Sequence, residues 1–544
     1  MAVVGVVLVM LLAVVASTFL VRMSPRPIPA PLVQIALGAV IAFTTNFRVP
    51  LNPELFFLLF LPPLLFIDGW RIPKHGLFRD GWTILELALG LVVFTTIGLG
   101  FFIHWMIPAM SIPVAFALAA VLSPTDPIAV SAITSRTPMP KRLMHILEGE
   151  SLLNDATGLV FLRFAVVAAL TGTFSIGDAT LTFLQLSVGG LAIGVAVTWG
   201  ITSAKNLLSQ KFGEESGSQI LVSLMIPFAA YLLAEQFHCS GILAAVAAGI
   251  TMSYVELSGQ ALASTRVRRS AVWDAVQFAL NGVIFVLLGE QLPGIVAGAS
   301  ETLAAGGGQQ PWQIALYAFA IMLVLIVLRF TWVWASLRFT IFRERRNGEV
   351  VPKPSFRLVA AISLAGVRGA ITLAGVMTLP LVLANGAPFP ARDLAILLAA
   401  SVIVLSLLLA TFFLPMALKG IEFGLDPRRE LAEDRARVAA AEVAMRAIEH
   451  AQHTMAVAQA DPDTYADAAA RIMDLYRHRI DGRSTAEAAD EVRRIDDIER
   501  RLRLAGLRAE RDEIYRIARA RNLDDDIARK LVREIDLLEA RYVG

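Results

Sequence analysis

Long apolar segments follow one another along most of this chain, and they restrict its possible folds more than any other feature of the sequence. A helix needs about 20 mainly apolar residues to cross the hydrocarbon core of a bilayer. With 56% hydrophobic and 17% charged residues, the chain lies outside the range of soluble globular proteins. About thirteen segments satisfy the length rule, and they span residues 2–21, 30–46, 54–70, 82–108, 112–135, 145–171, 182–204, 217–236, 240–255, 271–293, 311–337, 357–384 and 392–419. The sequence therefore predicts an all-α polytopic membrane protein.

The basic residues of the connecting loops alternate between the two sides of this predicted bundle. Lys and Arg collect in the cytoplasmic loops of membrane proteins. The odd-numbered loops contain several each, whereas the even-numbered loops contain almost none beyond Arg48 and Arg392. This alternation supports the number of segments, and it predicts that the N-terminus lies outside and the C-terminus in the cytoplasm.

The composition changes after Gly424. Residues 425–544 are rich in Arg, Asp, Glu, Ala and Leu, and apolar side chains recur there at helical spacing. We therefore expect a transmembrane domain over residues 1–424 and a charged, helical cytoplasmic domain over residues 425–544. The sequence of the second domain has no glycine loop for nucleotides and no cluster of metal ligands. We therefore expect this domain to serve assembly or regulation.

Several classes of protein are excluded by what the sequence lacks. Its single cysteine, Cys239, rules out an internal disulfide framework, and no Cys/His spacing typical of a metal site occurs. The sequence has no nucleophile–base motif that would indicate an enzyme. The formal net charge of +2 gives no reason to expect a nucleic acid partner. We expect no cofactor.

A carboxylate lies at membrane depth in the fifth apolar segment, where residues 123–127 read Ser-Pro-Thr-Asp-Pro. Such a charge is retained only where it faces a cavity or a partner. Pro124 and Pro127 each remove an amide donor and interrupt a helix, and the freed carbonyl groups and helix ends can hold ions. Asp126 then balances the helix ends or lies beside a cation. The alternative is a plain proline kink that Asp126 caps.

A second acidic cluster, Glu-Gly-Glu-Ser-Leu-Leu-Asn-Asp, occupies residues 148–155 of the sixth segment. On a helix, Glu150 and Asn154 lie one turn apart, as do Ser151 and Asp155. Oxygen ligands without thiols or imidazoles suit a hard cation such as sodium or lithium. Asp155 could then bind a proton or a cation in competition, which is the minimum chemistry for exchange. The alternative is a buried hydrogen-bonded network that only specifies packing.

Arg368 lies in the middle of the twelfth segment, within the run Gly-Val-Arg-Gly-Ala, and an arginine at membrane depth needs a partner. We expect that partner to be Glu150 or Asp126; the alternative is a cation that serves helix packing alone. Two other charges have two interpretations each. Asp68 lines an entrance funnel or caps an interface, and Arg163 pairs with an acidic group or extends to the membrane surface.

These residues carry a resemblance to a known family. The Thr-Asp-Pro break, the Glu-Ser-x-x-Asn-Asp run and the Gly-x-Arg-Gly-Ala segment resemble, in order and separation, motifs of sodium/proton antiporters of the first cation/proton antiporter group. These are the NhaP-type bacterial relatives of animal sodium/hydrogen exchangers. The Leu-Pro-Pro stretch that ends at Asp68 and the segment over residues 239–244 are similar to that family as well. The resemblance covers residues 1–420.

The resemblance implies a fold of two inverted repeats, with a dimerisation domain and a core domain. In the core domain the fifth and twelfth segments would form two crossed, broken helices. The resemblance also implies a homodimer in a bacterial plasma membrane that works by an elevator-like movement. Two residues depart from the family pattern: Asp68 stands where many relatives have Glu, and Arg163 fits only some bacterial members.

The resemblance further implies roles for individual residues. The cation- and proton-binding residues would be Asp155, Asn154, Ser151, Thr125 and Asp126. Na+ itself would be held by Asp155, Ser151 and Thr125, while Glu150 and Arg368 would form a structural ion pair. An asparagine before the aspartate, as at residues 154 and 155, resembles the electroneutral branch of the family, which exchanges one cation for one proton.

Three functions remain open at the level of the sequence. The first is a secondary antiporter that exchanges sodium or lithium for protons and so contributes to pH homeostasis. The second is a potassium/proton antiporter of the same architecture, because oxygen ligands do not fix the size of a cavity. The third is a cation channel or a membrane sensor, although the sequence shows no repeated filter and no ring of acidic residues.

Overall fold

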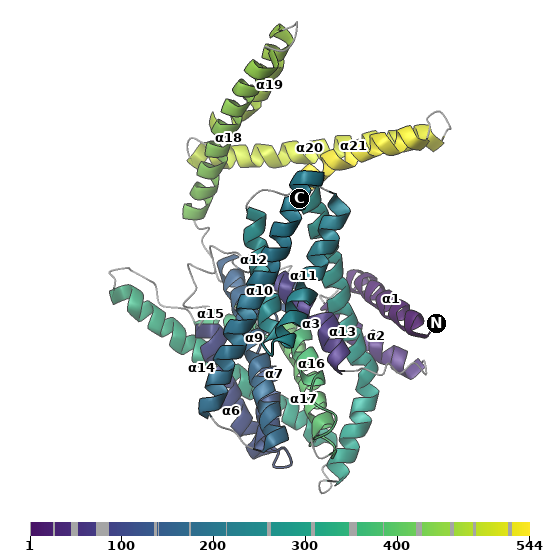
Figure 1. Ribbon diagram of the computed structural model, residues 1–544, viewed down its shortest axis with the longest axis vertical. Helices are drawn as coiled ribbons and strands as arrows, with labels where there is room; N and C mark the ends of the chain where they lie inside the picture. Colours follow the sequence, from purple (N-terminus) through teal and green to yellow (C-terminus); the bar gives the residue numbers. More distant parts are fainter. Residues whose placement is uncertain are drawn as a thin grey trace. The chain divides into compact units, whose positions relative to one another are not determined.

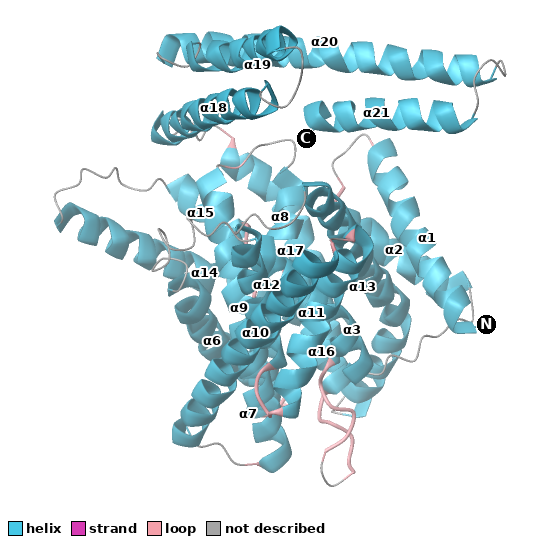
Figure 2. Cartoon of the chain, turned by 45° about the horizontal axis from the view of Figure 1, so that its top comes forward, coloured by secondary structure: helices cyan, strands magenta, loops and turns pink. Residues whose placement is uncertain are grey.

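The computed structural model describes most of the chain (Figure 1). The residues that it describes are 2–24, 28–44, 53–71, 86–134, 139, 141–172, 176–213, 215–257, 263–305, 311–346, 356–383, 386–419, 427–456, 462–481, 486–519 and 525–543. Their regular structure is helical, with an isolated β-bridge between Val382 and Pro388 and no strand among them (Figure 2). The chain divides into two compact units, Met1–Ile421 and Glu422–Gly544. The predicted all-α architecture is confirmed, whereas the predicted boundary after residue 424 lies outside the described residues.

Apolar helices build the first unit. In chain order they are α1 (Ala2–Met23), α2 (Ala30–Thr44), α3 (Pro53–Arg71), the π-helix η1 (Glu86–Gly90), α6 (Leu91–Met106), α7 (Ile112–Leu122), α8 (Pro127–Thr134), α9 (Lys141–Thr171), α10 (Ile176–Phe212), α11 (Ser216–Gln236), α12 (Gly241–Leu257), α13 (Ala263–Ala305), α14 (Pro311–Arg346), α15 (Phe356–Leu364), α16 (Ala370–Met377) and α17 (Arg392–Leu418). By length and composition, 8 described helical segments can cross a membrane, and shorter apolar helices lie among them. The chain is thus multi-pass, while the number of spans stays a prediction.

Two of the predicted segments are each divided into two short helices. The segment over residues 112–135 forms α7 and α8, and the segment over residues 357–384 forms α15 and α16. The amide of Asp126 in the first break donates a hydrogen bond to the carbonyl of Val367 in the second (2.7 Å). The two breaks therefore lie against each other, as expected for crossed, broken helices. Their relation by an inverted repeat stays a prediction.

The helices of the first unit form two bundles. The first bundle contains α1–α3 and α10–α13; within it α2 packs along α13, and α12 packs along α3, α10 and α11. The second bundle contains η1, α6–α9 and α14–α17; within it α7 packs between α6 and α9, and α17 packs against α14 and α15. The bundles meet where α13 contacts α16 and α17, where α3 contacts α16 and α9, and where α12 contacts α9. Both broken helices thus belong to the second bundle.

Glycines allow helices of the first bundle to approach closely. A side chain at Gly38 of α2 would collide with the backbone of Val286 in α13, and one at Gly289 of α13 would collide with the backbone of Ile35 in α2. Gly69 gives α3 the same close contact with the backbone of α12. Small residues of this kind permit the van der Waals packing that joins helices in lipid. The pairs α2–α13 and α3–α12 are therefore firm internal contacts of this bundle.

Four charged helices form the second unit, namely α18 (Pro427–Ala456), α19 (Pro462–Asp481), α20 (Ala486–Arg519) and α21 (Asp525–Val543). Within this unit α18 packs against α19, and α20 packs against α21. Leu507 of α20 is buried, as are Val532 and Ile535 of α21, and Arg511 bridges Asp536 at 2.8 Å. The apolar spacing in the sequence corresponds to these buried faces. The location and role of the unit stay predictions.

Candidate cation and proton site

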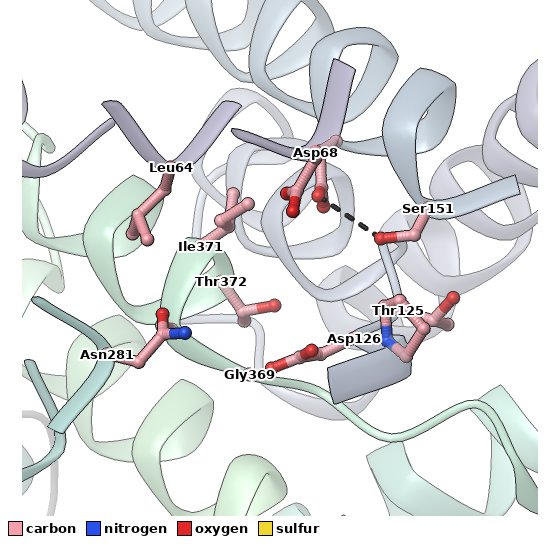
Figure 3. Close-up of a pocket in the computed structure, with 12 residues that line it drawn as sticks. Leu64, Asp68, Thr125, Asp126, Ser151, Asn281, Gly369, Ile371 and Thr372 are labelled. Atoms are coloured by element: carbon pink, nitrogen blue, oxygen red, sulfur yellow. Dashed lines mark hydrogen bonds between the residues drawn. The ribbon is translucent and has the colours of Figure 1, made fainter. Parts of the chain in front are cut away.

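A pocket in the first unit is lined by residues of both bundles. Asp68 of α3 and Asn281 of α13 are its polar lining from the first bundle. The polar lining from the second bundle consists of Thr125, Asp126, Ser151, Asp155 and Thr372. Figure 3 shows labelled polar side chains around this space, with Leu64 and Ile371 beside them. Carboxylate, hydroxyl and amide oxygens from distant parts of the sequence are thus gathered in one place.

The helix α9 supplies two of these oxygen-bearing side chains from successive turns. Asp155 is 3% exposed and Ser151 is 4% exposed. The hydroxyl of Ser151 donates a hydrogen bond to Oδ2 of Asp155 (3.4 Å), drawn as a dashed line in Figure 3. The charges of Asp68 and Asp126 also act on Asp155. Because like charges repel in a medium of low dielectric constant, a proton or a cation at this carboxylate relieves the repulsion.

A chain of hydrogen bonds connects the first break to α9. The side-chain amide of Asn154 donates to the hydroxyl of Thr125 (3.2 Å), which in turn donates to Oε1 of Glu150 (3.3 Å). All three residues are buried. Asn154 Oδ1 has no hydrogen-bond partner among the described residues. Asn154 does not itself line the pocket, so its contact is with Thr125, which does.

Glu150 pairs with Arg329 of α14. The guanidinium donates to both carboxylate oxygens, from Nη1 to Oε1 at 2.5 Å and from Nη2 to Oε2 at 2.9 Å. The two side chains are 0% and 2% exposed. The predicted ion pair between Glu150 and Arg368 is therefore wrong, because the planar fork of Arg329 takes both oxygens of the carboxylate in a bidentate geometry. The sequence contained a signal: Arg329 is also a lone arginine in an apolar segment, and such a residue needs a partner.

Arg368 instead binds the carbonyl groups of the two breaks. Its Nε donates to the carbonyl of Leu122 at the end of α7 (3.0 Å), and its Nη1 donates to the carbonyl of Gly366 just after α15. Its backbone amide donates to the hydroxyl of Ser406 (3.1 Å). A cation is favourable at helix C-termini, where unpaired carbonyl groups carry partial negative charge. Arg368 thus compensates the C-terminal ends of both broken helices.

Asp126 lies at the opposite ends of the half-helices. Oδ1 of Asp126 accepts a weak hydrogen bond from the amide of Ala129 in the first turn of α8 (3.4 Å). Its carboxylate also lies so close to Gly369, directly before α16, that any side chain at Gly369 would collide with it. Carboxylates are stabilised at helix N-termini by the same dipole argument. Asp126 thus lies at the N-terminal ends of two half-helices and also lines the pocket, and its role stays a prediction.

The remaining sequence-predicted residues also have defined positions. Asp68 lines the pocket from the first bundle, and Arg163 pairs with Glu235 of α11 at 2.8 Å. Sequence reasoning missed Asn281 and Thr372, which line the pocket. A polar residue inside a predicted span was the available signal for both, but many such residues only satisfy local hydrogen bonds.

The donor set restricts the chemistry that this pocket can support. Its polar atoms are the oxygens of carboxylates, hydroxyls and one amide, together with the nitrogen of Asn281. Oxygen ligands of this type suit hard cations. No group of three or more His, Cys, Asp or Glu side chains is arranged to hold a metal ion within the described ranges. The donor set therefore suits a hard cation, and Asp155 is the most enclosed carboxylate of the pocket.

Comparisons with known proteins agree with this chemistry. The family model described as "Sodium/hydrogen exchanger, transmembrane" matches residues 8–420. The chain is 40% identical over 543 residues to YjcE of Escherichia coli, named an uncharacterized Na+/H+ exchanger, and the match covers 99% of this chain and 98% of that protein. It is 43% identical over 408 residues to a Bacillus pumilus protein named a sodium, potassium, lithium and rubidium/H+ antiporter, covering 75% of this chain and 60% of that protein.

A solved structure has a similar fold. The sodium proton antiporter MjNhaP1 of Methanocaldococcus jannaschii matches with a TM-score of 0.59 and 18% identity, over 77% of this chain and 99% of that chain. At this level of identity the likeness bears on the fold alone.

Proposed function

The chain belongs to the sodium/hydrogen exchanger family, and we propose that it is a secondary antiporter that exchanges sodium or lithium for protons at Asp155. The coarser statement, a membrane transporter that exchanges cations and protons, follows from the family. The identity of the cation, the residues that bind it and the stoichiometry are the proposal.

One observation carries this proposal: Asp155 is a buried carboxylate in a pocket that both bundles line. An isolated carboxylate in a water-poor environment is costly, so it is neutralised by a proton or by a bound cation. Only a site that holds a proton or a cation can then pass through the state in which the pocket is closed to water. This restriction couples the flux of protons to the flux of cations. Competition between the ions at one carboxylate is sufficient for antiport.

The oxygens near Asp155 support a site for a small cation. Ser151 already contacts the carboxylate, and Thr125 lines the same pocket from the break before Pro127, where the chain has left α7. We assign the cation to Asp155, Ser151 and Thr125. Asn154 holds the Thr125 hydroxyl in place through its hydrogen bond.

The compensation of the other buried charges supports an electroneutral exchange. Glu150 is paired with Arg329, and Asp126 lies at helix N-termini. Asn154, rather than a second carboxylate, directly precedes Asp155 in the motif. Exchange at Asp155 alone would move one cation for one proton.

Potassium is the second candidate substrate. The Bacillus pumilus relative carries potassium and rubidium in its name, besides sodium and lithium, and it is 43% identical to this chain over 408 residues. A site with few direct ligands discriminates weakly between alkali ions, since selectivity depends on cavity size, ligand number and rigidity. We therefore keep a potassium/proton antiporter as the alternative; a channel or sensor has no observation in its favour.

The proposal also covers the membrane location and the oligomeric state of the protein. Alternating loop charges support a bacterial plasma membrane orientation with the N-terminus outside and the second unit in the cytoplasm. The helices α1, α10 and α14 expose many large apolar side chains, as a lipid-facing surface requires. A homodimer is proposed from the family resemblance alone.

Everted membrane vesicles with a preformed proton gradient test the function. Addition of sodium or lithium is expected to collapse the gradient, and Asp155→Asn is expected to abolish this collapse because an amide cannot exchange a proton for a cation. Asp393→Asn is the matched control, since Asp393 is 46% exposed and lies at the start of α17, outside the pocket. A response that survives in Asp155→Asn would refute the assignment, and a response to potassium alone would favour the second candidate.

A further inference from the structure

The pocket is lined by both bundles, so its alternate opening to the two sides of the membrane requires the bundles to move relative to each other. This requirement rests on the proposed function. A polar contact that joins the bundles in one position must then break when they move. Residues that form such a contact help to decide which position is populated.

Arg163 of α9 and Glu235 of α11 form a contact of this kind. Nη2 of Arg163 donates to Oε1 of Glu235 at 2.8 Å. The helix α9 belongs to the second bundle and packs against α7, whereas α11 belongs to the first and packs against α10 and α12. Tyr231, one turn before Glu235, lies near enough to Arg163 for the two side chains to interact. Two side chains of the first bundle thus hold one side chain of the second.

Glu235 is fixed within the first bundle independently of Arg163. Its Oε1 accepts a hydrogen bond from the amide of Gly241, the first residue of α12 (3.3 Å). A carboxylate at a helix N-terminus is favourable. Gly241 is also in close contact with the ring of Tyr231, which leaves no room for a side chain at that position. When Arg163 departs, Glu235 therefore keeps a partner and Tyr231 keeps its packing.

Arg163 is carried by the helix that bears the site. It follows Asp155 by two turns of α9, which is about 12 Å along the axis of a regular helix. Any movement of α9 that changes the exposure of Asp155 also displaces Arg163 from Glu235. The side chains of Arg163 and Glu235 are 38% and 36% exposed, so water can solvate the guanidinium once it has left.

Two other ion pairs of the first unit each join helices of one and the same bundle. Arg329–Glu150 joins two helices of the second bundle, and Arg71–Asp274 joins α3 to α13 within the first bundle (2.5 Å). Neither pair needs to break when the bundles move as bodies. The pair Arg71–Asp274 therefore offers a matched control for the pair Arg163–Glu235.

We propose that Arg163 and Glu235, with Tyr231, form a latch between the two bundles that stabilises one of the two access states and opens in every transport cycle. The partial exposure of the pair and the second partner of Glu235 make the opening reversible. The latch thus sets the rate and the population of the access states, while Asp155 sets the exchange of ions.

Reversible cross-linking in the full-length protein tests the latch. In a Cys239→Ser background, Arg163→Cys and Glu235→Cys are joined by a bifunctional methanethiosulfonate whose spacer matches the length of an arginine–glutamate pair. Cation-dependent proton movement in vesicles is expected to fall at least tenfold after cross-linking and to recover when the reagent is reduced. The same reagent on Arg71→Cys with Asp274→Cys is expected to leave exchange unchanged, because both positions lie in one bundle.

The outcomes separate the latch from the proposed function. Exchange at an unchanged rate in the cross-linked 163–235 protein, or no cross-link between these positions, would overturn the latch. Loss of cation-dependent exchange in the unmodified protein would instead refute the function. Neutral substitutions give a second readout: Arg163→Gln and Glu235→Gln are expected to change turnover alike, with the double variant equal to either single one. Additive effects of the two substitutions would also overturn the latch.

Discussion

The charged side chains around the pocket differ in how they are compensated. Glu150 has the fork of Arg329, and Arg368 has the carbonyl groups of Leu122 and Gly366. Asp155 has one hydrogen bond, from Ser151, and no ion pair among the described residues. A carboxylate that the protein leaves uncompensated is available to a mobile positive ion. At the scale of the residue, the paired charges thus differ from Asp155, the carboxylate that we propose to exchange ions.

We expect the fold to lose much of its stability when one partner of the buried pair Glu150–Arg329 is removed. Arg329→Gln leaves a buried carboxylate without its partner, and breaking such a pair costs about 3–5 kcal/mol. Thermal unfolding in detergent measures the loss, with Arg71→Gln as the control, because an exposed pair such as Arg71–Asp274 contributes about 0–1 kcal/mol. Equal melting temperatures of the two variants would show that Arg329 is not a structural partner of Glu150.

The two breaks act together at the scale of the element. Each half-helix end meets a charge of opposite sign: Arg368 binds carbonyl groups at two C-terminal ends, and Asp126 lies at two N-terminal ends. The amide of Asp126 and the carbonyl of Val367 hold the breaks in contact. Pro127 begins α8, a position where a missing amide donor costs nothing. The breaks are therefore stable structures that bring Thr125 and Gly369 to the pocket.

Gly369→Ala is expected to disrupt this crossing. The added methyl group would overlap the carboxylate of Asp126, and overpacking of a close contact costs about 1–3 kcal/mol. We expect a lower melting temperature together with a large loss of cation-dependent exchange in vesicles. Gly200→Ala in α10 is the control, because a side chain there meets no atom within 4 Å. Full exchange in Gly369→Ala would contradict the crossing as described.

The sequence predicted which residues line the site better than it predicted which charged side chains pair with one another. Asp155 and Ser151 were identified because polar oxygens in apolar segments are costly unless they serve a cavity, and Thr125 was identified by the family resemblance; all three line the pocket. The same reasoning requires a partner for Glu150 but cannot select Arg329 over Arg368, since both are lone arginines in apolar segments. That choice depends on which helices become neighbours, and helix order in a bundle is a tertiary property. Asn281 was missed for the same reason.

At the scale of the whole molecule, the two units of the chain have separate hydrophobic cores. The pocket and all the residues that line it lie within Met1–Ile421. The helices of the second unit bury apolar faces against one another, as Leu507 and Val532 illustrate. All the residues to which we assign the exchange therefore lie in the first unit.

Truncation after Gly424 is expected to leave cation-dependent exchange in place, within a few-fold of the full chain at the optimal pH. The physical reason is that no pocket residue is removed. The pH profile of exchange and the oligomeric state in detergent then assign the tail: a shifted profile indicates regulation, and a lost dimer indicates assembly. A truncated protein that inserts normally but does not exchange would show that the site depends on the second unit.

Competition between proton and cation at Asp155 is measured most simply as proton release. When sodium is added to purified protein in weakly buffered solution, each bound ion displaces the proton from the carboxylate, since cation ligands must be deprotonated to bind. We predict release of about one proton per bound cation, stronger binding at higher pH, and neither effect in Asp155→Asn. Sodium binding without proton release, or release that persists in Asp155→Asn, would contradict exchange at this residue.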